Sequence, residues 1–227
     1  MMTQNKENAA SAALEEVRDG MVLGLGTGST TALFLERLAE KARDEDLELC
    51  GVPTSIQTAH LATRLGIRLV ALNEVDVVDL AVDGCDEFDA NLDLIKGRGG
   101  AMVREKVVDY AAKRLVILAN GPKRVEQLGG LVPVPVEVLP FAWAAVAREI
   151  DELGAEWDLR EGTAKDGPVV TDNGNLILDT RFGLIDDPAA LEHRLAIIPG
   201  VVGSGLFTGH VDIVYCGTNE GVDVIKR

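Results

Sequence analysis

Acidic and basic side chains alternate with glycines between residues 82 and 105 (VDGCDEFDANLDLIKGRGGAMVRE). This segment contains the carboxylates of Asp83, Asp86 and Glu105 and the ammonium group of Lys96. Carboxylates take up and release protons, an ammonium group stabilises negative charge on an oxygen, and glycines let backbone N–H groups approach a small anion closely. Because apolar runs flank this polar segment, we interpret it as the active site of an enzyme acting on a small phosphorylated substrate.

The chemistry that suits these groups is removal of a proton next to a carbonyl group. A carboxylate would act as the base and the cation would stabilise the resulting enediolate, so no cofactor is expected. One alternative is a divalent metal bound by Asp83 and Asp86, with Asp89 as a third ligand. Another is a solvated acidic turn without a chemical role.

A second segment is suited to hold a phosphate group. The apolar run at residues 21–26 is followed by TGST and by the helix-like run TALFLERLAEKA. Backbone N–H groups and the positive end of a helix dipole attract anions at such a turn, and three hydroxyl groups add donors. A dinucleotide-binding fingerprint is an alternative, but Ser29 replaces its third glycine. In the other alternative, Ser29 or Thr30 only caps a helix.

Strand-like and helix-like segments alternate through the first half of the chain. The strands are expected at residues 21–26, 47–53, 67–72, 77–84 and 115–120. This order predicts an α/β fold with a Rossmann-like, doubly wound, mostly parallel sheet. Because ligands bind beyond the carboxyl ends of such strands, the glycine turn and the Asp83 loop are expected to converge. Lys123 follows the last of these strands, where it either reaches a phosphate or is a solvated surface lysine.

The composition changes in the second half of the chain. Residues 129–140 are rich in Gly and Pro, which indicates a crossing between domains. Helices are expected at 141–153 and 188–196, and strands at 156–161, 168–172 and 175–182, with a hairpin turn at 172–175. We therefore predict a Rossmann-like catalytic domain at 1–129 plus 206–227, and a second, smaller α+β domain at 130–205.

The net charge of −15 argues against general binding of nucleic acids, which requires a cationic surface. No apolar run has the length of a membrane span, and the N-terminal residues do not resemble a signal peptide. The three cysteines are scattered, as is common in a reducing compartment. We expect a cytoplasmic enzyme with a small-molecule partner, and neither nucleic acid nor membrane as a partner.

Five motifs in this chain resemble the A-type ribose-5-phosphate isomerases. They are GLGTGSTTALFLERL, AVDGCDE, LIKGRGGAMVREK, PVEVLPFAWAAVAREI and VTDNGNLILD. They follow the order and spacing of that family over nearly the whole chain. The resemblance implies cofactor-free interconversion of D-ribose 5-phosphate and D-ribulose 5-phosphate in the non-oxidative pentose phosphate pathway. It also implies a homodimer or homotetramer.

The resemblance further implies roles for individual residues. Glu105 matches the general base that moves a proton between C1 and C2, and Lys96 and Asp83 match groups that handle sugar oxygens, Asp83 also helping ring opening. Arg98 departs from the glycine of many relatives and is expected to face solvent while its backbone keeps the turn. The residues expected to bind substrate are Thr27, Gly28, Ser29, Thr30, Asp83, Gly84, Cys85, Asp86, Lys96, Gly97, Arg98, Gly99, Lys123 and Lys6.

Two other functions fit part of the pattern. One is a non-catalytic domain that senses sugar phosphates, which would not require Glu105. The other is a different sugar-phosphate isomerase or deaminase on the same fold. The absence of a histidine beside the acidic segment argues against the deaminase.

Overall fold

The computed structural model describes residues 2–164 and 166–227, and it divides into two compact units. Unit 1 comprises the chain up to Cys85, Arg104–Arg124 and His210–Arg227, and unit 2 comprises Asp86–Val103 and Val125–Gly209. This division differs from the predicted ranges chiefly at residues 86–103, which were expected in the first domain. The reason is strand pairing, because β6 (Leu94–Ile95) pairs with β12 (Leu206–Phe207) of unit 2.

Unit 1 is built on a seven-stranded sheet in the order β14-β13-β7-β4-β1-β2-β3. All neighbouring strands are parallel except β13 and β14, which are antiparallel. The strands are β1 (Val22–Leu25), β2 (Cys50–Pro53), β3 (Arg68–Leu69), β4 (Leu80–Gly84), β7 (Leu115–Asn120), β13 (Ile213–Gly217) and β14 (Val222–Lys226).

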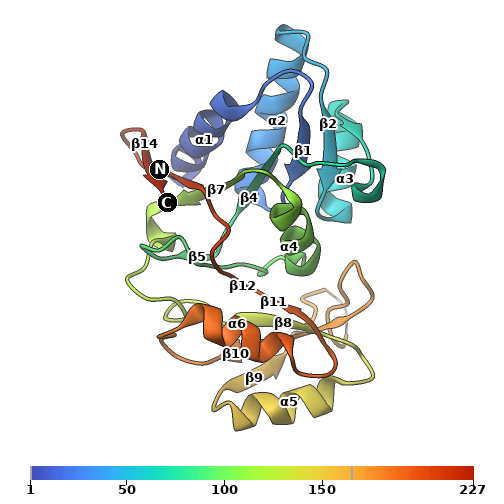
Figure 1. Ribbon diagram of the computed structural model, residues 1–227, viewed down its shortest axis with the longest axis vertical. Helices are drawn as coiled ribbons and strands as arrows, with labels where there is room; N and C mark the ends of the chain where they lie inside the picture. Colours follow the sequence, from blue (N-terminus) through green and yellow to red (C-terminus); the bar gives the residue numbers. More distant parts are fainter. Residues whose placement is uncertain (1, 165) are drawn as a thin grey trace. The chain divides into compact units, whose positions relative to one another are not determined.

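Helices cover both faces of this sheet (Figure 1). On one face, α1 (Met2–Ala13), α2 (Ser29–Asp44) and α3 (Ile56–Leu65) share an apolar core with Leu23 and Leu25 of β1. On the other face lies α4 (Met102–Ala111), which belongs to unit 1 from Arg104 onward. A Cβ atom at Gly24 would lie 2.8 Å from Val108 Cγ1, so the glycine is what lets α4 approach β1. The predicted doubly wound α/β fold is confirmed.

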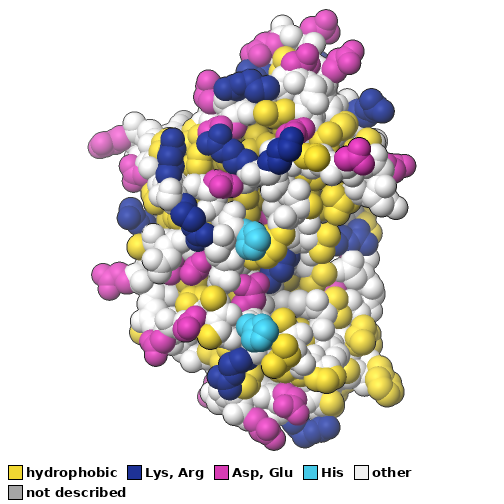
Figure 2. Space-filling model, in the orientation of Figure 1, with side chains coloured by type: hydrophobic (Ala, Val, Ile, Leu, Met, Phe, Trp, Pro, Cys, Tyr) yellow, Lys and Arg dark blue, Asp and Glu magenta, His cyan; other side chains and the backbone are white. Residues whose placement is uncertain are grey.

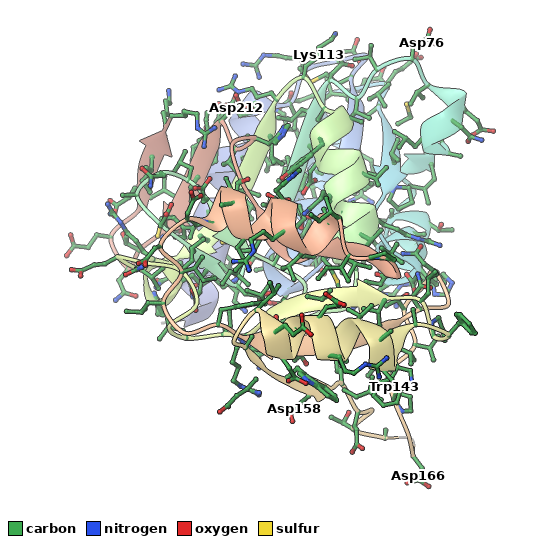
Figure 3. The ribbon with its side chains drawn as sticks, turned by 60° about the horizontal axis from the view of Figure 1, so that its bottom comes forward. Asp76, Lys113, Trp143, Asp158, Asp166 and Asp212 are labelled. Atoms are coloured by element: carbon green, nitrogen blue, oxygen red, sulfur yellow. The ribbon has the colours of Figure 1, made fainter. Side chains whose placement is uncertain are left out.

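The order of the strands reverses at β1. The chain runs from β1 outward through β2 and β3, then returns to place β4 on the other side of β1. The carboxyl ends of β1 and β4 are therefore neighbours, which is where doubly wound sheets bind ligands. Asp76, Lys113 and Asp212, labelled in Figure 3, precede β4, β7 and β13 and so mark the opposite, amino-terminal edge.

Unit 2 contains a four-stranded antiparallel sheet in the order β11-β8-β10-β9 and a three-stranded sheet in the order β12-β6-β5. Valine and leucine side chains of the larger sheet pack with those of two helices in one core. The elements not yet given are β5 (Glu87–Phe88), β8 (Val134–Val138), β9 (Glu156–Leu159), β10 (Leu176–Arg181), β11 (Val201–Ser204), α5 (Trp143–Glu152) and α6 (Pro188–Ala196). Short 3-10 turns occupy Leu14–Glu16, Leu72–Glu74 and Gly121–Lys123.

Two expectations about the second half of the chain are wrong. Residues 129–140 were expected to cross between domains, but their Val134–Val138 segment is a buried central strand, because its valines fill the core of unit 2. Residues 168–172 were expected to be a strand, but only Pro168 forms a bridge, with Glu161, and β10 pairs instead with β9. The turn that follows is held by the buried Glu137 carboxylate, whose Oε1 accepts three side-chain hydrogen bonds.

Within the described part of the chain, every helix falls short of the length and hydropathy that a membrane span requires. Figure 2 shows acidic side chains spread over the visible surface rather than gathered in one patch.

Candidate active site

The glycine turn after β1 and the carboxylate at the end of β4 are bonded to each other. Asp83 is fully buried, and its Oδ1 accepts hydrogen bonds from the N–H groups of Thr27 (3.1 Å) and Gly84 (2.6 Å). A Cβ atom at Gly26 would lie only 2.2 Å from Asp83 Cγ, so only glycine allows this approach. The predicted convergence of these two segments is therefore present in unit 1.

The turn leads into α2 in the way that an anion site requires. Gly28 is the residue before the helix and has a φ of 134°, a conformation that favours glycine. The first turn of α2 contains no acidic side chain, and its first N–H groups have no partner within the helix. Ser29 is exposed and Thr30 is buried. This geometry suits a phosphate group bound at the positive end of the helix.

Lys6 lies beside the same turn. Its Nζ donates a hydrogen bond of 2.9 Å to the hydroxyl of Ser29, although α1 and α2 are far apart in the sequence. The close packing of α1 on β13 explains the placement, because a Cβ atom at Gly217 would lie 1.7 Å from the carbonyl oxygen of Asn5. A lysine and a helix terminus together favour a dianionic ligand at this point.

Lys123 also reaches this edge of the sheet. It ends the short 3-10 turn that follows β7, and its Nζ donates a hydrogen bond to the carbonyl oxygen of Cys85. The Cys85 thiol is buried and not part of a disulfide. Lys123 is partly buried and so is not a fully solvated surface lysine.

Glu105 lies in the first turn of α4, with 5% of its surface exposed. Its carboxylate is thus buried near the positive end of a helix. Removal from bulk water prepares a carboxylate to act on a bound substrate rather than on solvent.

The remaining predicted residues belong to unit 2. Lys96 follows β6 and is 2% exposed, and its Nζ lies 5.3 Å from the centre of the Phe207 ring. Its backbone N–H donates a hydrogen bond of 2.8 Å to the carbonyl oxygen of Gly205. A buried ammonium group over an aromatic ring has a restricted position, which suits a group that stabilises charge on one particular oxygen.

The loop after Lys96 is tied to Asp86. Oδ2 of Asp86 accepts a hydrogen bond of 2.9 Å from the backbone N–H of Arg98. The side chain of Arg98 is exposed, as expected, while its backbone maintains the turn. Gly97 has a φ of 103°, and a Cβ atom there would lie 2.9 Å from Cβ of Met102. Gly99 is exposed between these two points.

Asp89, the third carboxylate of the metal alternative, has another role. Its Oδ1 accepts hydrogen bonds from the N–H groups of Asn91 (2.9 Å) and Asp93 (3.0 Å) and so shapes a turn. Among residues 2–164 and 166–227, His, Cys, Asp and Glu side chains form no group of three or more that could hold a metal ion.

Three buried hydroxyl residues at this edge were not predicted. Thr27 Oγ1 lies 2.8 Å from Thr54 Oγ1, 2.7 Å from Ser55 Oγ and 3.1 Å from Thr58 Oγ1. Thr58 also donates a hydrogen bond to the carbonyl oxygen of Gly26 (2.8 Å). In the sequence these residues appear only as the start of a helix, and Ser55 is indeed the cap of α3. Their position after β2, the strand next to β1, was the available signal.

Together, the fold and these groups define an α/β enzyme with an anion-binding turn, a buried carboxylate and a buried lysine. The family model for ribose 5-phosphate isomerase A (phosphoriboisomerase A) matches residues 50–221. Ribose-5-phosphate isomerase A of Methanothermobacter thermautotrophicus is 50% identical over 221 residues, covering 97% of each chain. The chain belongs to the ribose-5-phosphate isomerase A family.

Solved structures agree with this assignment. A D-ribose-5-phosphate isomerase in complex with phospho-erythronic acid has a TM-score of 0.97 and 47% identity, and the match covers 99% of both chains. Ribose 5-phosphate isomerase A from Methanocaldococcus jannaschii has a TM-score of 0.96 and 46% identity, with both chains covered completely.

Proposed function

We propose that the protein interconverts D-ribose 5-phosphate and D-ribulose 5-phosphate, with Glu105 as the general base. The reaction class follows from membership in the family. The assignment of residues rests on the chemistry and burial of the groups described above. The observation that carries it is the contact of the buried Asp83 carboxylate with the N–H of Thr27, which joins a carboxylate to the anion-binding turn.

The proposed reaction moves one proton between two carbons of the open-chain sugar. Glu105 removes the proton from C2 of the aldose, and the negative charge that develops on the carbonyl oxygen is stabilised by Lys96. The same proton, or one exchanged with solvent, is then delivered to C1, while a proton leaves the C2 hydroxyl and the C1 oxygen gains one. The product is the ketose, and no electrons are gained or lost overall.

The phosphate group is proposed to anchor the substrate in unit 1. Its oxygens would accept hydrogen bonds from the N–H groups at the start of α2 and from the hydroxyls of Thr27, Ser29 and Thr30. Lys6, already bonded to Ser29, would add positive charge. Asp83 would assist opening of the ribose ring. A relative was solved with phospho-erythronic acid, which by its name combines a phosphate and a carboxylic acid on a short chain. A carboxylate resembles an enediolate in its charge and its two oxygens.

The direct test is incubation of the purified protein with ribose 5-phosphate in the presence of a chelator. We expect ribulose 5-phosphate to form at an undiminished rate, because the proposed chemistry uses only side chains of this chain. Absence of turnover with and without added metal would support a sensor, whereas turnover only with metal would favour the metal alternative.

Replacement of Lys123 by Ala is expected to raise KM for ribose 5-phosphate by about 10-fold and to change kcat little, since a phosphate anchor contributes mainly uniform binding. The measurement is a steady-state comparison with Lys226→Ala, an exposed lysine on the edge strand β14. An unchanged KM would remove Lys123 from the substrate site.

We further propose a cytoplasmic location and assembly into a homodimer or homotetramer. An apolar surface in unit 2 supports assembly. Phe141 is 100% exposed, and Leu139, Ile197 and Val202 are 46%, 66% and 41% exposed. These residues lie at one corner, because Leu139 donates its N–H to Gly200 (2.9 Å) beside the edge strand β11. An edge strand with an apolar border suits a second copy of this chain.

Replacement of Phe141 by Asp is therefore expected to reduce the molar mass measured by light scattering toward that of a monomer. A charge placed at the centre of an apolar interface disfavours association. Leu184→Asp is the control, because Leu184 is 63% exposed but packs near Gly130, before the other end of β8. Equal masses for both variants and the unmodified protein would place the interface elsewhere.

A further inference from the structure

Arg160 holds the loop that follows Lys96, although it lies in a distant part of the sequence. Its Nη1 donates hydrogen bonds to the carbonyl oxygens of Gly97 (2.9 Å) and Arg98 (3.1 Å). Its Nε and Nη2 bind the two carboxylate oxygens of Asp179 at 2.8 and 2.5 Å. The side chains of Arg160 and Asp179 are only 15% and 17% exposed. All four contacts lie within unit 2.

The guanidinium group is not needed to build the strands around it. The backbone N–H of Arg160 bonds to Ile177 (2.9 Å), and its carbonyl oxygen accepts the N–H of Val169 (2.8 Å). Asp179 is already paired through its backbone with Asp158 of β9 and Pro135 of β8. The side chains of Arg160 and Asp179 are therefore available for another task, and the loop carbonyls are what they contact.

These contacts fix the direction of two peptide planes. In a trans peptide the N–H points away from the C=O of the same unit. With the Gly97 carbonyl on Arg160, the N–H of Arg98 faces the other way, where it binds Asp86. With the Arg98 carbonyl on Arg160, the N–H of Gly99 is also turned away from Arg160. The loop can take this course because Gly97 and Gly100 have φ values of 103° and 77°.

We propose that Arg160, held by Asp179, is a positioning residue for the reaction. It fixes the loop so that the Gly99 N–H and the Lys96 ammonium group keep the orientation in which they bind the sugar oxygens. This inference rests on the proposed function, because it assigns a purpose to the rigidity of that loop. Arginine suits the task because its planar fork binds a carboxylate on one edge and carbonyl oxygens on another, which an ammonium group cannot do with the same geometry.

The test compares Arg160→Met with Arg181→Met. Arg181 pairs with Asp158 (2.6 Å) across the same two strands, but that pair is exposed at 49% and 68% and Asp158 lies at the border of the ribbon in Figure 3. For Arg160→Met we expect kcat to fall about 10- to 100-fold, because small displacements of catalytic groups cost this much. KM should change less than about 3-fold, since the phosphate is held by residues of unit 1. Arg181→Met should retain normal kinetics.

A second readout separates positioning from general stability. Amide hydrogen exchange of residues 96–100 is expected to accelerate at least about 10-fold in Arg160→Met relative to Arg181→Met, while the remaining strands of unit 2 exchange as before. Asp179→Asn, which keeps the shape of the side chain, is expected to show a smaller effect in the same direction. It takes the place of Arg160→Met if that variant does not fold.

Normal kcat and unchanged loop exchange in a folded Arg160→Met or Asp179→Asn variant would overturn the inference. A fall in thermal stability with no change in kcat would overturn it as well, because that is the result for a purely structural ion pair. Failure of the proposed function has a different outcome, since the unmodified protein and Arg181→Met would then both lack isomerase activity.

Discussion

Replacement of Glu105 by Gln is expected to lower kcat for ribose 5-phosphate by at least about 100-fold, the usual scale for a lost general base. The carboxamide has nearly the same size as the carboxylate but cannot accept the C2 proton. Because Glu105 is buried in the first turn of α4, a change of similar shape should leave the helix and its packing intact. The measurement is steady-state kinetics, with circular dichroism and thermal unfolding to verify the fold.

Glu36→Gln is the matched control for this variant. Glu36 is an exposed glutamate on α2, and its replacement removes the same charge without reaching the proposed catalytic groups. Activity within about two-fold of the unmodified protein is expected for the control, since exposed charges contribute little. A Glu105→Gln variant with near-normal kcat would remove Glu105 from the mechanism and leave Asp83 as the carboxylate to be examined.

Replacement of Lys96 by Met is expected to lower kcat by about 100-fold or more, the scale for loss of one preorganised donor to a developing oxyanion. Methionine retains an unbranched side chain of similar length, so packing near the Phe207 ring is largely preserved while the positive charge is lost. Substrate binding should weaken less than turnover falls, because the charge on the oxygen develops mainly in the transition state.

Lys113→Met is the control for Lys96→Met. Lys113 is an exposed lysine that pairs with Asp79 at the amino-terminal edge of the sheet, away from the carboxyl ends of the strands (Figure 3). Loss of this surface ion pair should leave kcat unchanged. If Lys96→Met instead raised KM with an unaltered kcat, Lys96 would be a binding residue rather than a stabiliser of the enediolate.

The parts of this molecule that were predictable depend on local sequence order. A strand, a glycine turn and a helix follow one another directly at residues 21–44, so the anion-binding turn and its location at the carboxyl edge of the sheet could be inferred. The contact between that turn and Asp83 followed from the same rule for doubly wound sheets. The family motifs supplied the roles of Glu105 and Lys96, which composition and periodicity alone do not reveal.

The parts that were not predictable depend on contacts between distant segments. The strand Val134–Val138 contains a proline and lies in a Gly- and Pro-rich run, and only its burial between β10 and β11 identifies it as a strand. The Arg160 contacts with Gly97 and Arg98 span more than 60 residues. Thr54, Ser55 and Thr58 appeared as a helix start because the proximity of Thr27 is a tertiary property. Such pairings leave no periodic signal in a single sequence.

The fate of the C2 hydrogen tests the central claim most directly. Ribose 5-phosphate carrying deuterium at C2 is converted in ordinary water by the unmodified protein, and the ribulose 5-phosphate is analysed by NMR. Proton transfer through a carboxylate and an enediolate predicts that deuterium is lost to solvent in at least part of the product. Complete migration of deuterium from C2 to C1, with no exchange under any condition of turnover, would indicate a direct hydride shift and contradict the account.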